Sequence, residues 1–207
     1  MKRKYIWLNL VVMSSYPLLL LEQKIKSAGF VRVEPVNDYI SIVKNKYRKL
    51  LDLSVDLDIP VLDNRCPLMV DYCLRQDILV NVADIDPILI HIAKELANRN
   101  DLKDGQIFII TPCLSLKLFG KNLKLERVVF MTWDEWVECY GAVETSKSLD
   151  DSPIPLGFFG EIEKSVLSIT NNNLNLLFTD LSKYRLVEGL YCEKGCHNGD
   201  GVTCLKK

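Results

Sequence analysis

The sequence lacks three features that would point to particular classes of protein. It has no uninterrupted apolar run of about 18 residues, so no transmembrane span is expected. It has no excess of charge, because 26 basic and 27 acidic residues give a net charge of −1; this offers no electrostatic reason to expect nucleic acid or an anionic membrane as a partner. It also has no internal repeat and no low-complexity tract. Its 48% hydrophobic and 26% charged residues suffice for a full core in one domain or two small lobes.

Cysteine is present in an odd number, with seven residues spread widely along the 207 of the chain. A chain of this size needs no disulfide bonds for stability, so the pattern favours a reducing compartment and thiolate chemistry. The basic start, Lys2 to Lys4, and the apolar residues after it imitate a secretory signal. However, Asn9 interrupts the apolar run and no small-x-small cleavage site follows it. We therefore expect a cytoplasmic protein.

Short β-rich runs alternate with helical patterns, which is typical of an α/β fold with open, mostly parallel sheets and flanking helices. Strands are predicted over 4–13, 30–36, 59–63, 106–110 and 126–131. Helices are predicted over 17–28, 38–52, 67–76, 86–98 and 158–170, and a capping-box pattern at Thr132 begins another that ends at Tyr140. Residues 171–173 break the chain before a last β-rich portion. We expect a single domain of two small lobes, 1–141 and 158–207, joined by a linker over 142–157.

Four cysteines stand where an iron-sulfur site could form. Cys192 and Cys196 are four residues apart among glycines, which let the backbone fold tightly and aim N–H groups at an anionic core. Cys66 and Cys113 stand beside prolines, each just after a predicted strand. Because the carboxyl ends of parallel strands border one crevice, we expect all four thiols to meet there, between the two lobes.

Three segments resemble the catalytic domain of iron-only (FeFe) hydrogenases and of shorter hydrogenase-like relatives. They are Arg65-Cys66-Pro67, Thr111-Pro112-Cys113, and the run from Glu188 through Cys192 and Cys196 to Gly201. The resemblance covers roughly residues 25–140 and 175–201. It implies that Cys66, Cys113, Cys192 and Cys196 ligate a 4Fe-4S cluster. It also implies that Cys196 has the position that bridges this cluster to a diiron centre in the enzymes.

The chain departs from the family at positions that serve hydrogen chemistry. Arg65 replaces a proton-relaying cysteine, and its guanidinium stays protonated near neutral pH. Leu116 and Phe119 replace a lysine and a glutamate, and Thr111 and Leu190 replace methionines. We therefore expect a hydrogenase-like, oxidoreductase-like metal-binding protein that acts in electron transfer or in redox- or hydrogen-linked sensing, without hydrogen turnover. Its partner would be a ferredoxin, an electron-transfer subunit or a signalling protein.

Two other readings of the cysteines stay open. One is a reduced-size hydrogenase, or another reductase, with a substrate or a diiron centre beside Cys196; whether the chain is an enzyme is thus not decided by the sequence. The other is a structural zinc protein that uses the same cysteines.

Four residues close to the cysteines in sequence are candidates for contact with the cofactor: Arg65, Glu188, Gly195 and His197. Arg65 would offset cluster charge if it is not simply a surface residue, and Glu188 matches the family's glutamate but could equally form a strand-end salt bridge. His197 either bonds a cluster sulfide or faces solvent in a turn. The remaining candidates are assigned no ligand role: Cys73 and Cys139 are expected in the core, His91 on a helix, and Cys204 outside the ligand set.

Overall fold

The structure, a computed structural model, describes residues 2–54 and 58–206. The strands in this part of the chain are β1 (Arg3–Trp7), β2 (Phe30–Arg32), β3 (Val61–Leu62), β4 (Asn81–Val82), β5 (Gly105–Thr111), β6 (Val128–Thr132), β7 (Val166–Ile169) and β8 (Leu186–Gly189). Its α-helices are α1 (Leu10–Ser15), α2 (Leu18–Ser27), α3 (Tyr39–Leu53), α4 (Pro67–Arg75), α5 (Ile88–Asn98), α6 (Leu114–Asn122) and α7 (Trp133–Tyr140). Short 3-10 helices are η1 (Asn100–Leu102), η2 (Leu174–Phe178), η3 (Cys196–Asn198) and η4 (Thr203–Lys206).

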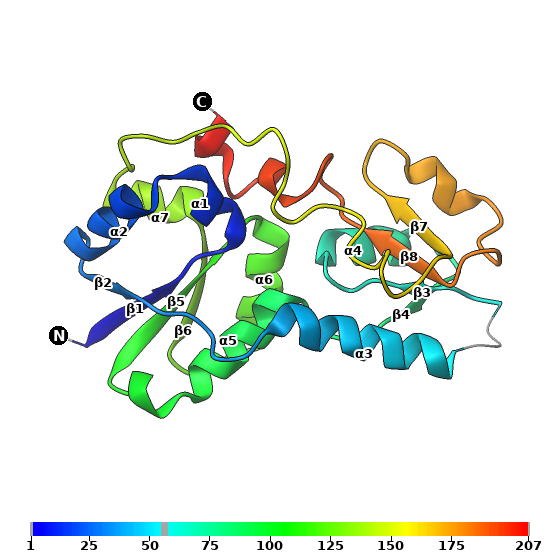
Figure 1. Cartoon of the computed structure of the whole chain (residues 1–207), viewed down its shortest axis with the longest axis horizontal. Helices are drawn as coiled ribbons and strands as arrows, with labels where there is room; N and C mark the ends of the chain where they lie inside the picture. The colour runs from blue at the N-terminus through cyan, green and yellow to red at the C-terminus, as the bar shows by residue number, and fades with distance from the viewer. Residues whose placement is uncertain (1, 55–57, 207) are drawn as a thin grey trace.

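The described strands form two four-stranded sheets that lie side by side (Figure 1). The strand order is β2-β1-β5-β6 in the first sheet and β4-β3-β8-β7 in the second, and every pairing is parallel. Helices flank both sheets, so the predicted α/β class with open parallel sheets is confirmed. Within residues 2–54 and 58–206, no helix combines the length and the apolar character needed to cross a membrane.

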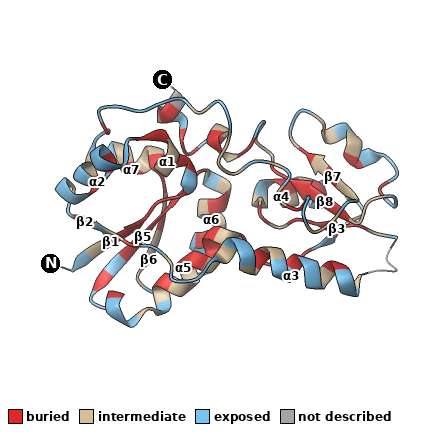
Figure 2. Ribbon diagram, viewed as in Figure 1, coloured by how far each residue is buried: buried red, intermediate tan, exposed pale blue. Residues whose placement is uncertain are grey.

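The first sheet is covered on both faces, which explains why β5 is almost continuously apolar. Alternate side chains of a strand point to opposite faces. Ile6 and Phe108 therefore pack against α1, α2 and α7, whereas Tyr5 and Ile107 pack on the other face with α5. Figure 2 shows β5 buried along most of its length.

The second sheet is smaller and is also covered on both faces. Helix α3 contributes Val43 and Tyr47 to one face, and α4 contributes Met69 and Cys73 to the other. Cys73 is fully buried, which confirms its expected place in the core. Each sheet with the helices that cover it forms one lobe of the structure, and α3 joins the two lobes, because Tyr39 at its start packs with the core of the first sheet.

The chain passes between the two sheets more than once. Strands β3 and β4 lie between β2 and β5 in sequence, yet they pair with each other, and β3 also pairs with β8, which follows residue 158. The second sheet therefore draws strands from both of the lobes expected as 1–141 and 158–207. After β8 the chain returns once more, and Val202 and Leu205 pack in the core of the first sheet. Segment 142–157, yellow-green to yellow in Figure 1, is one of these crossings.

The predicted strand over 4–13 is wrong beyond Trp7, because Asn9 begins helix α1. The Asn9 side chain accepts a hydrogen bond from Val12 N at 3.2 Å, as an N-cap does. Its amide nitrogen donates to the carbonyl oxygen of Ile110 at 3.1 Å, which ties the helix start to β5. The asparagine that interrupts the apolar run thus marks the N-cap of a helix.

The predicted helix over 158–170 is also wrong. Turns around Phe159 precede strand β7, which pairs parallel with β8. Phe159 is fully buried against the second sheet, so its apolar character reflects loop packing rather than a helical face. Helix α6 and the short strand β4 were not predicted from the sequence.

The capping box predicted at the start of α7 is confirmed. Thr132 Oγ1 accepts from Glu135 N at 3.2 Å, and Thr132 N donates to the Glu135 carboxylate at 2.9 Å. We expect Thr132→Ala to lower the free energy of unfolding by about 1 kcal/mol, since an orphan N–H loses its acceptor. Urea unfolding measures this loss. Thr132→Ser should recover most of it, and the exposed Glu138→Ala on the same helix should change little. Equal losses in the alanine and serine variants would assign the effect to methyl packing instead.

Candidate functional site

The four candidate ligand cysteines come from the carboxyl ends of strands in both sheets. Cys66 follows β3, Cys113 follows β5, and Cys192 and Cys196 follow β8. The Cys196 thiol lies within electrostatic range of the other three, and the Cys113 thiol within range of Cys66 and Cys192. The structure therefore gathers the four thiols at one place between the lobes.

Two of these cysteines occupy the N-cap positions of nine-residue helices. Cys66 precedes α4 and Cys113 precedes α6. The Cys113 sulfur accepts from Leu116 N at 3.5 Å, and the N–H groups of Tyr191 and Met69 favour the thiolate form of Cys66. A helix N-terminus carries partial positive charge, which lowers the free energy of an anionic sulfur. Both helices thus direct their positive ends toward the group of thiols.

Burial opposes ionisation of the same thiols. It raises the pKa of Cys66 and raises the pKa of Cys113 to about 12. The pKa of Cys196 lies well above its ordinary value, first because of burial and then because of the three neighbouring sulfurs. Four thiolates close together need a compensating cation. A bound metal would lower the pKa of these thiols, because it takes the place of their protons.

The donor set matches an iron-sulfur cluster in kind, because it consists of four cysteine thiols. Among the described residues, no three His, Cys, Asp or Glu side chains are close enough together to hold a single metal ion. A cubane cluster takes four cysteine thiolates, which is the set that meets here.

The segment after Cys196 is fastened to the loop that carries Cys113. Gly201 N donates to the Pro112 carbonyl oxygen at 3.1 Å, and the Asp200 carboxylate accepts from Leu114 N at 2.9 Å. A Cβ atom at Gly199 would overlap the Pro112 carbonyl oxygen, so this close approach requires glycine. These contacts hold Cys113 and Cys196 in a fixed relation although they are far apart in sequence.

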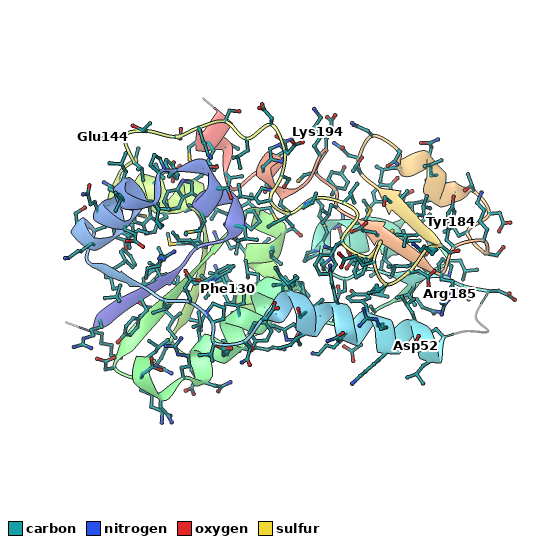
Figure 3. The ribbon with its side chains drawn as sticks, in the orientation of Figure 1. Asp52, Phe130, Glu144, Tyr184, Arg185 and Lys194 are labelled. Atoms are coloured by element: carbon teal, nitrogen blue, oxygen red, sulfur yellow. The ribbon has the colours of Figure 1, made fainter. Side chains whose placement is uncertain are left out.

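The turn between Cys192 and Cys196 depends on Gly195. Gly195 N donates to the Cys192 carbonyl oxygen at 3.1 Å, and Gly195 has a φ of +108°. A Cβ atom there would overlap the carbonyl oxygen of Ile154 in the crossing segment. Lys194, with a φ of +56°, lies at the outer edge of the turn (Figure 3). The local backbone thus explains Gly195 without any direct contact to a cofactor.

We expect Gly195→Ala to lower the free energy of unfolding by at least about 1–3 kcal/mol, the usual cost of a side chain in such a backbone region, with the overlap at Ile154 added to it. Chemical denaturation gives the value. Gly160→Ala is the matched control, because a Cβ atom there would make only an ordinary contact, at 3.6 Å. A loss at Gly195 no larger than that at Gly160 would contradict the expectation.

Arg65 is buried in a network of two carboxylates. Its Nε lies 2.8 Å from Asp63 Oδ2, and its Nη2 lies 2.6 Å from Glu188 Oε1. Glu188 also accepts from the backbone N–H groups of Gly157 at 2.7 Å and Phe158 at 2.9 Å, so it ties β8 to the crossing segment. The strand-end salt bridge considered for Glu188 is thus present. Asp63 and Glu188 compensate the positive charge of Arg65 from within the protein.

Aromatic rings and a phenol complete the surroundings of Arg65. The guanidinium carbon lies 4.2 Å from the ring centre of Phe158 and 4.6 Å from that of Phe159. Tyr47 Oη donates to Asp63 Oδ1 at 3.0 Å. Burial raises the pKa of Asp63, and the Arg65 charge opposes that shift. Asp63, Tyr47 and both phenylalanines were not predicted from the sequence. The available signal was Asp63 itself, an acidic residue at the end of a predicted strand, two positions before Arg65.

A cavity of about 460 Å³ lies beside Cys196, between the lobes. Its inner wall consists largely of buried apolar side chains, among them Trp7, Leu89, Ile92, Leu116 and Leu190. Arg65 also borders it, and residues 153–158 of the crossing segment form another wall. Two positions at which the chain departs from the hydrogenase pattern, Leu116 and Leu190, therefore face one hollow together with Cys196.

Other candidate residues lie apart from this group. His197 is buried rather than solvent-facing, because it lines a small cavity with Val11 and Leu205; the expectation of a solvent-exposed turn histidine is wrong. Cys139 is exposed, and its expected core position is also wrong, since the buried stripe of α7 consists of Trp133, Trp136, Val137 and Tyr140. His91 lies on helix α5, as expected, and its ring stacks on Tyr39 of α3. The backbone N–H of Cys204 donates to the Asp134 carboxylate at 3.0 Å.

A comparison of the sequence with known protein families found no family that matches. A comparison with curated proteins found no similar protein either.

Proposed function

We propose that this chain binds a 4Fe-4S cluster through Cys66, Cys113, Cys192 and Cys196, and that it acts as a hydrogenase-like protein in electron transfer or in redox- or hydrogen-linked sensing, without hydrogen turnover. The observation that carries the proposal is the meeting of four thiols from three strand ends in both sheets. Four cysteine thiolates are the usual ligand set of such a cluster.

The chain's own groups would hold and shield the cluster. The N-termini of α4 and α6 would stabilise the thiolates of Cys66 and Cys113, and the contacts of Gly201 and Asp200 would keep Cys196 beside Cys113. With four thiolate ligands, a bound cluster supplies one-electron chemistry and has no open coordination position. A function of this kind needs a redox partner or a signalling partner, and the cysteine content favours a cytoplasmic setting.

The surroundings of Cys196 argue against hydrogen turnover. Arg65 stands where the hydrogenase resemblance expects a proton-relaying thiol, and two carboxylates hold its guanidinium. Leu116 and Leu190 offer apolar side chains where that resemblance expects a lysine and a methionine. A guanidinium stays protonated at neutral pH, and an aliphatic side chain carries no titratable proton.

One observation favours a second candidate function. The cavity beside Cys196 has room for a small molecule or a second metal centre. A reduced-size hydrogenase, or another reductase whose substrate binds there, is therefore the alternative.

Metal analysis and spectroscopy on the full chain test the proposal. The protein would be prepared anaerobically, with and without hydrogenase maturation factors, and assayed for iron, sulfide and zinc. Electron paramagnetic resonance and infrared spectra would follow. About four irons per chain, a signal that responds to reduction, and no carbonyl or cyanide bands would support the proposal. Such bands together with extra iron would favour the hydrogenase alternative, and zinc in place of iron would contradict both.

A further inference from the structure

The cavity beside Cys196 has the features of a small-molecule site in its own right. At about 460 Å³ it lies within the usual range of ligand pockets. Its inner wall is formed from both lobes: Trp7 is the last residue of β1 in the first sheet, and Leu190 follows directly after β8 of the second. Such a hollow, with apolar walls and few polar groups, is the usual form of a site that buries most of its ligand.

One polar group reaches the cavity with a hydrogen bond left to give. Arg65 borders the cavity, and its Nε and Nη2 donate to Asp63 and Glu188. Among the described residues, the third nitrogen, Nη1, donates to no group. Nη1 is also not fully enclosed by protein atoms. Phe158 and Phe159 lie against the guanidinium. The free edge of Arg65 therefore presents a rigid N–H donor toward a ligand.

The charges around the cavity select against an ionic ligand. Asp63 and Glu188 compensate Arg65, and the ammonium group of Lys44 lies 2.7 Å from Glu161. Two exposed carboxylates, those of Glu34 and Asp38, border the cavity at its outer side. An anion would meet these carboxylates without an uncompensated cation inside, and a cation would find neither Asp63 nor Glu188 on the cavity wall to pair with.

From these observations we infer that the cavity binds an uncharged, mainly apolar organic molecule whose carbonyl-type oxygen accepts a hydrogen bond from Arg65 Nη1. The inference goes beyond cluster binding and does not depend on it, because the cavity walls belong to the chain itself. A ligand there would lie against Cys196, and hence next to the proposed cluster.

The test uses a matched series of three naphthalene probes on the full chain, purified without metal. The probes are 2-acetylnaphthalene, which has a carbonyl acceptor, 2-ethylnaphthalene, which has none, and 2-naphthoate, which is an anion. Titration calorimetry should give one site per chain for the ketone, with affinity about tenfold or more above that for either other probe. The ketone should also change the fluorescence of Trp7, and Trp7→Phe should remove that change while the heat of binding persists.

Two tryptophan variants locate the site. Leu156 borders the cavity, so Leu156→Trp should fill it and weaken ketone binding at least tenfold. Leu118 is exposed on α6 and does not border it, so Leu118→Trp should leave binding unchanged. No saturable binding of the ketone, equal or tighter binding of the hydrocarbon or the anion, or indifference to Leu156→Trp would each overturn the inference. A chain that binds the ketone but never takes up iron would contradict the proposed function and still support this inference.

Discussion

Cys113→Ser and Cys196→Ser are each expected to reduce the iron content of the anaerobically reconstituted chain from the proposed value of about four per molecule to a small fraction of it. This is the largest effect expected of any substitution. Both sulfurs belong to the group of four thiols, and each lies within electrostatic range of at least two others. Serine keeps the size of the side chain but is a poor ligand for iron, so the loss reports ligation rather than packing.

The chain supplies its own control for these variants. Cys139 is exposed on α7 and outside the group, so Cys139→Ser should retain the full iron content. Iron and sulfide assays, with the visible absorption of the reconstituted protein, measure the outcome. Circular dichroism of each metal-free variant shows whether the fold is kept. A folded Cys113→Ser or Cys196→Ser chain that keeps its cluster would contradict the proposed ligand set.

Arg65→Met is expected to lower the free energy of unfolding by about 3–5 kcal/mol. Asp63 and Glu188 are both fully buried, and removal of the guanidinium leaves their two carboxylates close together without a cation. Methionine approximates the length of the side chain, so little of the loss comes from an empty volume. Urea unfolding of the metal-free chain measures the change without interference from a cluster.

Two further variants separate charge from packing. Asp63→Asn and Glu188→Gln, added to Arg65→Met, remove the unpaired charges and should restore a large part of the lost stability. Arg75→Met breaks an exposed pair with Asp71 on α4 and should cost less than about 1 kcal/mol. If the variant with all three substitutions is no more stable than Arg65→Met alone, the buried charges are not the source of the lost stability.

The sequence was informative wherever the controlling interactions are local. Alternating strands and helices predicted the α/β class, and the spacing of Thr132 and Glu135 predicted a capping box that the structure contains. Asn9 shows the limit of such reasoning, because an apolar run on both sides of it suggested one strand. Its second hydrogen bond, to Ile110, joins residues far apart in the chain and could not be anticipated from neighbours.

Long-range pairing accounts for what could not be predicted. The network of Arg65 joins Asp63, two residues away, to Glu188, which is 123 residues away. Strand β7 fell within a predicted helix because the apolar residues before it, such as Phe159, pack as a loop against the core of the second sheet, which includes residues from α3 and β3. Nothing in a single sequence specifies which strands pair, so the passage of the chain between two sheets became visible only in the structure. The cavity beside Cys196 depends on that same passage.

Because the chain passes repeatedly between the sheets, the distances between the four sulfurs depend on the relative orientation of the two lobes. Cys113 belongs to the first sheet, whereas Cys66 and Cys192 extend from the second. Any rotation of one lobe against the other therefore stretches or compresses the set of sulfurs. A partner protein that displaced one lobe would therefore change the distances between the sulfurs, and a metal centre bound to all four would oppose that displacement.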